Sequence, residues 1–271
     1  MNKFTNLLVS ACMVLVLTNC GSEKKSDTTT EAPAEQSIRE IVEREFEYPV
    51  PTSFEVTTLI QDANAGFVLG ITNDVDNADK YISEYNKALN LGIYGADLSY
   101  ATTYNRQQET MQFLKASRSL VEDLNISGAF NTEMAQRMEA NIENKDSLIS
   151  IVTESFYDTY NYLNENGQDK LSLLVISGSV IEGLYITTQL LISSGYDAKL
   201  VEAFAQQKET VKKLELLLDQ FSDDPNINRV LPKIRYISLF YDGVGESEMT
   251  QGQIDDVSAS IEETRNEIVA G

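Results

Sequence analysis

Asp97 is surrounded along the sequence by tyrosines at helical spacing. Tyr94, Tyr100 and Tyr104 lie three, three and seven residues from it. Residues three or four apart share one face of a helix, so we expect these phenol groups to lie on the same side as the carboxylate. Apolar surroundings disfavour an ionised carboxylate, and acids perturbed in this way occur often at functional sites. These four residues are therefore candidate ligand-binding residues.

Glu182 is the second candidate, because it is the only charged residue between Leu171 and Ser194. Tyr185 follows it by three residues and shares its face. If the helices that carry Asp97 and Glu182 are both central, the two acids and the tyrosines line one polar pocket. Alternatively, each acid hydrogen-bonds a tyrosine, a serine or a backbone group inside the fold, as buried polar groups must. We favour this structural interpretation over ligand binding and over catalysis.

The composition excludes several kinds of chemistry. The chain has no histidine, which removes the usual general base near neutral pH, the commonest transition-metal ligand and every Ser-His-Asp or Cys-His arrangement. With 42 acidic and 21 basic residues its net charge is −21, so we expect no nucleic-acid partner. The acidic turn that begins near Asp74 has Ala78 and Tyr85 where a calcium-binding EF-hand needs oxygen ligands. We therefore expect neither a metal site nor a cofactor.

The first twenty residues have the pattern of an export signal. Lys3 precedes an apolar run from Leu7 to Leu17, and the sequence Leu-Thr-Asn-Cys ends at Cys20. This resembles the lipobox of bacterial lipoproteins, whose cysteine thiol receives a diacylglycerol and whose new N-terminus is acylated, for example with palmitate. The resemblance implies that residues 1–19 are removed as a signal peptide and that Cys20 is the lipid anchor. The alternative is an ordinary secretory signal or an uncleaved anchor, with Cys20 incidental.

The lipobox resemblance also implies a location and a tether. It places the protein in the cell envelope, anchored to a membrane through lipid. The two residues after Cys20 are not acidic, which favours the outer membrane, on its periplasmic or its surface face. Residues 20–51 are small and polar at first, a composition typical of a flexible tether. A capping-box pattern at Ser37 predicts a short helix there, which Pro49 and Pro51 end.

Residues 52–271 have the pattern of one all-α domain. Apolar residues recur at spacings of three and four, and turn residues divide them into about eight helices. The first helix begins at a capping box at Thr52 and extends to Phe67. Asp224 followed by a proline predicts the start of the last helix but one, and a capping box at Thr250 predicts the start of the last. In the second helix we expect Gly92 and Gly95 to bend or break the chain near Tyr94. The pattern predicts one long fourth helix, with its apolar stripe running from Met134 to Leu163.

The segment 171–194 differs from the other helices because it is apolar on all sides. Its 24 residues span about 36 Å as a helix, enough to cross a membrane. Glu182, Gln189 and seven serines and threonines oppose a transmembrane interpretation. We therefore predict an antiparallel helical bundle or array around 171–194 as an apolar central helix. An open superhelix is the alternative architecture.

These observations favour a non-enzymatic, lipid-anchored helical module of the cell envelope that binds a protein partner or a small ligand. The alternative is a carboxylate- and tyrosine-dependent enzyme, or a cation-binding protein, with its site around Asp97 and Glu182. Tyr157, Tyr160 and Tyr162 crowd the end of the fourth helix and cannot all face the core. They are candidates for an exposed contact surface.

Overall fold

In the computed structural model, all regular structure is helical within the described residues, which are 63, 65–129, 132–245 and 248–271. The all-α prediction is thus confirmed. The signal peptide, Cys20, the tether with its short helix, and the start of the predicted first helix lie outside the described residues. The described elements are a short 3₁₀-helix, η1 (Val75–Lys80), and the α-helices α3 (Glu84–Thr103), α4 (Gln107–Asp123), α5 (Thr132–Ala140), α6 (Lys145–Glu165), α7 (Asp169–Ser193), α8 (Ala198–Asp219), α9 (Pro225–Tyr241) and α10 (Gln251–Ala270).

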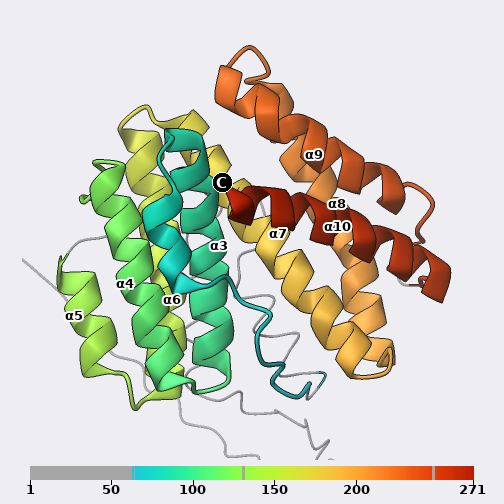
Figure 1. Cartoon of the computed structure of the whole chain (residues 1–271), viewed down its shortest axis with the longest axis horizontal. Coiled ribbons are helices and arrows are strands. Elements are labelled where there is room, and N and C mark those ends of the chain that lie inside the picture. The colour runs from blue at the N-terminus through green and yellow to red at the C-terminus, as the bar shows by residue number, and fades with distance from the viewer. Residues whose placement is uncertain (1–62, 64, 130–131, 246–247) are drawn as a thin grey trace, which may run out of the picture. The chain divides into compact units, whose positions relative to one another are not determined.

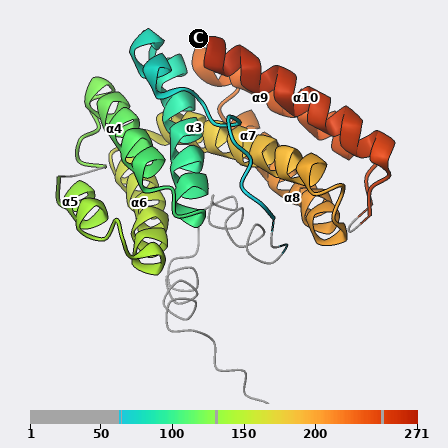
Figure 2. The same ribbon diagram turned by 60° about the horizontal axis from the view of Figure 1, so that its bottom comes forward.

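The apolar helix α7 lies at the centre of the helical domain. Helices α3, α4, α5 and α6 lie on one side of it and α8, α9 and α10 on the other (Figures 1 and 2). It packs against α3, α6, α8, α9 and α10. Although α7 is long and apolar enough to cross a membrane, 94% of its most apolar 18-residue window is buried inside the domain. The prediction of a central core helix is therefore confirmed.

Two glycines let the backbones of α3 and α7 approach closely. A Cβ atom on Gly92 would lie 1.9 Å from the carbonyl oxygen of Val175, and one on Gly178 would lie 1.9 Å from that of Leu89. The expected break at Gly92 and Gly95 does not occur, because α3 continues through both residues. Gly92 provides room for α7 and does not interrupt α3.

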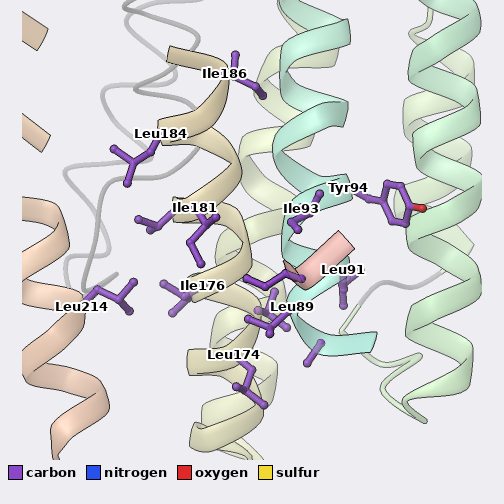
Figure 3. Packing of buried hydrophobic residues seen from close by; sticks show 14 of the residues in the cluster. Leu89, Leu91, Ile93, Tyr94, Leu174, Ile176, Ile181, Leu184, Ile186 and Leu214 are labelled. Carbon is purple, nitrogen blue, oxygen red and sulfur yellow. The ribbon is translucent and has the colours of Figure 1, made fainter. Parts of the chain in front are cut away.

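Apolar side chains fill the space around this close approach. Figure 3 shows Leu89 and Ile93 of α3 beside Leu174, Ile176 and Ile181 of α7. All five are buried in one hydrophobic cluster that includes residues from every α-helix of the described chain. This packing fixes α3 and α7 as the rigid elements from which polar side chains project.

The predicted long fourth helix is wrong, because the chain forms α5 and α6 instead. The helix α6 begins at Asn144, whose side-chain Oδ1 accepts a hydrogen bond from the backbone N–H of Ser147 at 3.1 Å. This cap satisfies a donor in the first turn of α6. The sequence does not reveal this break, because the half-buried Ile142 continues the apolar stripe through the loop between α5 and α6.

Local start signals were more reliable. Thr250 and Gln253 form the predicted capping box of α10. Asp224 caps α9 by accepting hydrogen bonds from the backbone N–H groups of Asn226 and Ile227 at 2.9 and 3.2 Å. Both signals involve groups within a few residues of each other, which is why the sequence alone reveals them.

The predicted first helix does not extend to Phe67. Residues 65–74, called here the N-terminal segment, contain no helix and run alongside α3 (Figures 1 and 2). Phe67 stacks on the ring of Tyr100, with centroids 5.3 Å apart, so its apolar side chain packs on α3 without being helical. The N-terminal segment is the element that covers the candidate acids.

Candidate functional site

The structure brings Asp97 and Glu182 together in the interior, beside Arg265 of α10. The two acidic side chains have 0% of their surface exposed, and Arg265 has 8%. The guanidinium of Arg265 donates from Nε to Oε2 of Glu182 at 2.9 Å and from Nη2 to Oε1 at 3.0 Å. Such a two-point contact is the strongest geometry for an arginine and a carboxylate. We call Asp97, Glu182 and Arg265 the acid cluster.

The N-terminal segment closes the acid cluster. The backbone N–H of Asn73 donates to Oδ2 of Asp97 at 3.0 Å, and Nη2 of Arg265 donates to the carbonyl oxygen of Ile71 at 3.3 Å. The side chain of Asn73 is also buried and donates from Nδ2 to the Tyr81 hydroxyl at 3.0 Å and to Oδ1 of Asn90 at 3.3 Å. The acids therefore bind the protein's own backbone.

Asp97 and Glu182 influence each other's ionisation within the acid cluster. Oδ1 of Asp97 accepts no hydrogen bond from the described residues, yet the Glu182 carboxylate lies within hydrogen-bonding reach of Asp97. Burial raises the pKa of Asp97 well above its ordinary value, and the charge of Glu182 raises it further. Burial also raises the pKa of Glu182, but the adjacent Arg265 guanidinium opposes that shift. Burial and the neighbouring carboxylate therefore favour the protonated form of Asp97, whereas Arg265 favours the ionised form of Glu182.

The end of α10 is held by the same network. The Tyr81 hydroxyl donates to the carbonyl oxygen of Val269 at 3.2 Å, and Nδ2 of Asn90 donates to that of Ile268 at 3.1 Å. These are among the last carbonyl groups of a helix, which have no partner within it. The side chains of Tyr81, which follows η1, and of Asn90 in α3 thus fasten the end of α10 to the rest of the domain.

Two candidate tyrosines within α3 and a third at its C-cap hold the N-terminal segment. Tyr94 donates to the carbonyl oxygen of Asp74 at 2.8 Å, and Tyr104 donates to that of Ala65 at 2.8 Å. The Tyr100 hydroxyl accepts from the N–H of Val68 at 2.8 Å and donates to its carbonyl oxygen at 3.1 Å. Burial raises the pKa of Tyr100 to about 12, so the phenol stays protonated and keeps its donor.

The last candidate, Tyr185, contacts the acid cluster through its ring. The guanidinium carbon of Arg265 lies 4.7 Å from the centroid of this half-buried ring. Such a contact stabilises a cation by about 0.5–2 kcal/mol, depending on how far it is desolvated. Tyr185 therefore supports the charge of Arg265.

This arrangement suits stability better than chemistry on an external molecule. A substrate would have to displace the N-terminal segment before it reached Asp97 or Glu182, because neither acid has exposed surface. The two acids do lie together, as the pocket hypothesis requires, but their polar neighbours are protein groups. No three His, Cys, Asp or Glu side chains are grouped to hold a metal ion among the residues that the structure describes.

Three members of this network were not among the candidate residues. Arg265 is the only basic residue of α10 and lies four residues after the buried Ile261, a signal that could have identified it. Asn73 belongs to a turn that reads as acidic and exposed, and Asn90 lies within an otherwise ordinary helical pattern. No family model, curated protein or solved structure matches this chain. The function must therefore be argued from its own residues.

Proposed function

We propose that this protein is a lipid-anchored helical module of the cell envelope that acts by binding and not by catalysis. The claim that it does not act by catalysis rests on one observation, the closure of the acid cluster. The residues best suited to acid-base chemistry, Asp97 and Glu182, have no exposed surface and are bound to Arg265 and to the backbone of the N-terminal segment. The rival proposal of an enzyme or a cation site at these acids receives less support from this geometry.

The anchor follows from the residues at the N-terminus. The sequence that ends at Cys20 resembles a lipobox, and the small, polar residues after it are suited to a tether between a membrane and a domain. Two or three acyl chains attach a protein far more firmly than one chain alone. The net charge of −21 gives no electrostatic attraction to an anionic membrane, so lipid must supply the attachment.

The anchor is tested by Cys20→Ala, with Cys12→Ala as the matched control. Both variants remove one thiol, but Cys12 lies within the part that lipoprotein processing discards. After expression in a bacterium that processes lipoproteins, we expect Cys20→Ala to leave the membrane fraction and to lose labelling by a radioactive fatty acid. The Cys12→Ala variant should keep both properties.

The opposite result would overturn the anchor. If Cys20→Ala stays in the membrane fraction to the same extent as Cys12→Ala, lipid on Cys20 is not what attaches the protein. An uncleaved signal segment would then be the next candidate for the anchor. The burial of α7 inside the domain makes that helix the weaker candidate for a span.

A further inference from the structure

A cavity lies between α3, α4, α6 and α7, away from the acid cluster. The cavity has a volume of about 50 Å³ and is partly open to solvent. Its walls are mostly apolar and include Leu91 and Leu98 of α3. Half-buried residues of α6, among them Phe156 and Tyr160, also line it, so it reaches the surface along that helix. We call this cavity the hydroxyl pocket.

Two serine hydroxyls in the hydroxyl pocket have no hydrogen-bond partner among the described residues. They belong to Ser117 of α4 and Ser172 of α7, whose exposed fractions are 5% and 2%. A helical serine normally satisfies its hydroxyl on a carbonyl of the preceding turn, as Ser155 does on Val152 at 2.6 Å in the same pocket. An unsatisfied buried hydroxyl costs stability. Two of them in one cavity indicate that a hydrogen-bonding group from outside the chain belongs there.

The lining determines which chemical class that group has. No charged side chain of the described part of the chain lines the pocket, so an ionised ligand would lose its hydration without a counter-charge. The apolar walls favour hydrocarbon, and the two serines can each donate to or accept from one oxygen. A single water needs roughly 10–15 Å³ of such space, so the pocket admits a short string of heavy atoms and excludes a nucleotide.

We propose that the hydroxyl pocket binds the end of a slim, uncharged hydrocarbon chain that carries one hydroxyl group, as in a straight-chain primary alcohol. The oxygen lies between Ser117 and Ser172, and the alkyl part extends along the apolar wall toward Phe156. Gly95 contributes to this shape, because a Cβ atom there would lie 2.8 Å from Cζ of Phe156. The glycine allows the Phe156 ring to rest against α3 beside the cavity.

The test is a calorimetric titration of the full chain with 1-hexanol, with sodium hexanoate as the charged counterpart of equal length. The protein is kept in mild detergent, and a detergent blank corrects for partitioning into micelles. We expect saturable binding of hexanol at one site and binding of hexanoate at least about tenfold weaker, because no cation lines the pocket. Absence of saturable hexanol binding, or tighter binding of hexanoate, would overturn the proposal.

Variants locate the binding. Ser117→Ala and Ser172→Ala should each weaken hexanol binding by about tenfold, the effect of losing one hydrogen bond. Ser258→Ala is the matched control, because Ser258 also has an unpartnered hydroxyl but does not line the pocket. Thermal unfolding of each variant verifies folding. Equal binding by all three variants contradicts the assignment to this pocket, and this result does not depend on whether Cys20 carries lipid.

Discussion

The acid cluster and the hydroxyl pocket both depend on α3 and α7, yet they treat polar groups in opposite ways. In the acid cluster Glu182 is paired twice with Arg265, and the N-terminal segment seals the site. In the hydroxyl pocket the hydroxyls of Ser117 and Ser172 have no hydrogen-bond partner within the described ranges, and the cavity opens along α6. Glu182 and Ser172 are ten residues apart on α7, or about 15 Å along the helix.

The difference follows from what each group costs to bury. An unpaired buried charge costs several kcal/mol, so the fold must use its own groups to satisfy an acid or an arginine. An unpaired neutral hydroxyl costs only about 1–3 kcal/mol, which a domain of this size tolerates. In this protein the strongly raised pKa of Asp97 therefore marks a structural element, whereas the uncharged serines mark the proposed site.

The largest effect is expected for Arg265→Met, which tests whether the acid cluster stabilises the fold. We expect it to lower the free energy of unfolding by about 3–5 kcal/mol at pH 7, because Glu182 would remain as an unpaired buried charge. Urea denaturation measures the loss. The matched control is Arg235→Met, which removes exposed ion pairs with Glu215 and Asp219 and should cost less than about 1 kcal/mol. Equal losses would mean that the acid cluster is no more important than a surface pair.

The second test is Asp97→Asn, which keeps the size and shape of the side chain but removes its ability to ionise. Asparagine can still accept from the Asn73 N–H and donate to Glu182, so we expect the variant to be at least as stable as the natural protein. In the unfolded chain Asp97 ionises near pH 4, whereas in the folded protein its raised pKa keeps it protonated to higher pH. The folded state thus binds more protons above pH 4, and the natural protein loses stability as pH rises toward the folded pKa.

The Asp97→Asn variant does not titrate, so its advantage should grow from about pH 4 upward by as much as 1.4 kcal/mol per pH unit. Urea denaturation from pH 4 to pH 8 measures it. Asp97→Ala is the control, because it removes the acceptor of the Asn73 N–H. At pH 4 this variant should be less stable than the natural protein by about 1–3 kcal/mol. A difference between the Asn variant and the natural protein that does not change with pH would refute the raised pKa of Asp97.

The smallest effect is expected at the hydroxyl pocket. Without ligand, Ser117→Ala removes an unsatisfied polar group and should raise the free energy of unfolding by up to about 1 kcal/mol. Ser177→Ala is the control, because the Ser177 hydroxyl donates to the carbonyl oxygen of Leu173 at 2.7 Å and its loss should give no gain. Thermal unfolding can resolve this difference. If Ser117→Ala is destabilising, its hydroxyl has a partner in the free protein.

The sequence predicted those features whose causes are local. The starts of α9 and α10 could be predicted because Asp224 and Thr250 cap groups within three residues of themselves. The apolar centre at α7 could be predicted because a helix that is apolar on all sides must be buried on all sides. The sequence suggested a break at Gly92, because the role of this glycine depends on a distant part of the chain. A Cβ atom there would lie only 1.9 Å from the carbonyl oxygen of Val175 in α7.

The acid cluster could be predicted only in part. Asp97 and Glu182 are conspicuous as charges in apolar helices, but the sequence does not reveal that Arg265 lies beside them or that Asn73 covers them. Ser117 and Ser172 gave no signal, because a helical serine that bonds its own helix has the same local sequence as one that faces a cavity. Packing between helices that are distant in the sequence decides between these cases, and local sequence patterns do not predict such packing.

The most direct test of the account is the ionisation of Asp97 in the folded protein. The side-chain carboxyl resonance of Asp97 can be followed by carbon-13 NMR as a function of pH in the full chain, with Asp97→Asn used for its assignment. A closed acid cluster predicts that Asp97 ionises only well above its ordinary pKa, because burial and the charge of Glu182 oppose its ionisation. Ionisation with a midpoint near the ordinary aspartate value of about 4 would contradict it, and would return Asp97 and Glu182 to the list of accessible site residues.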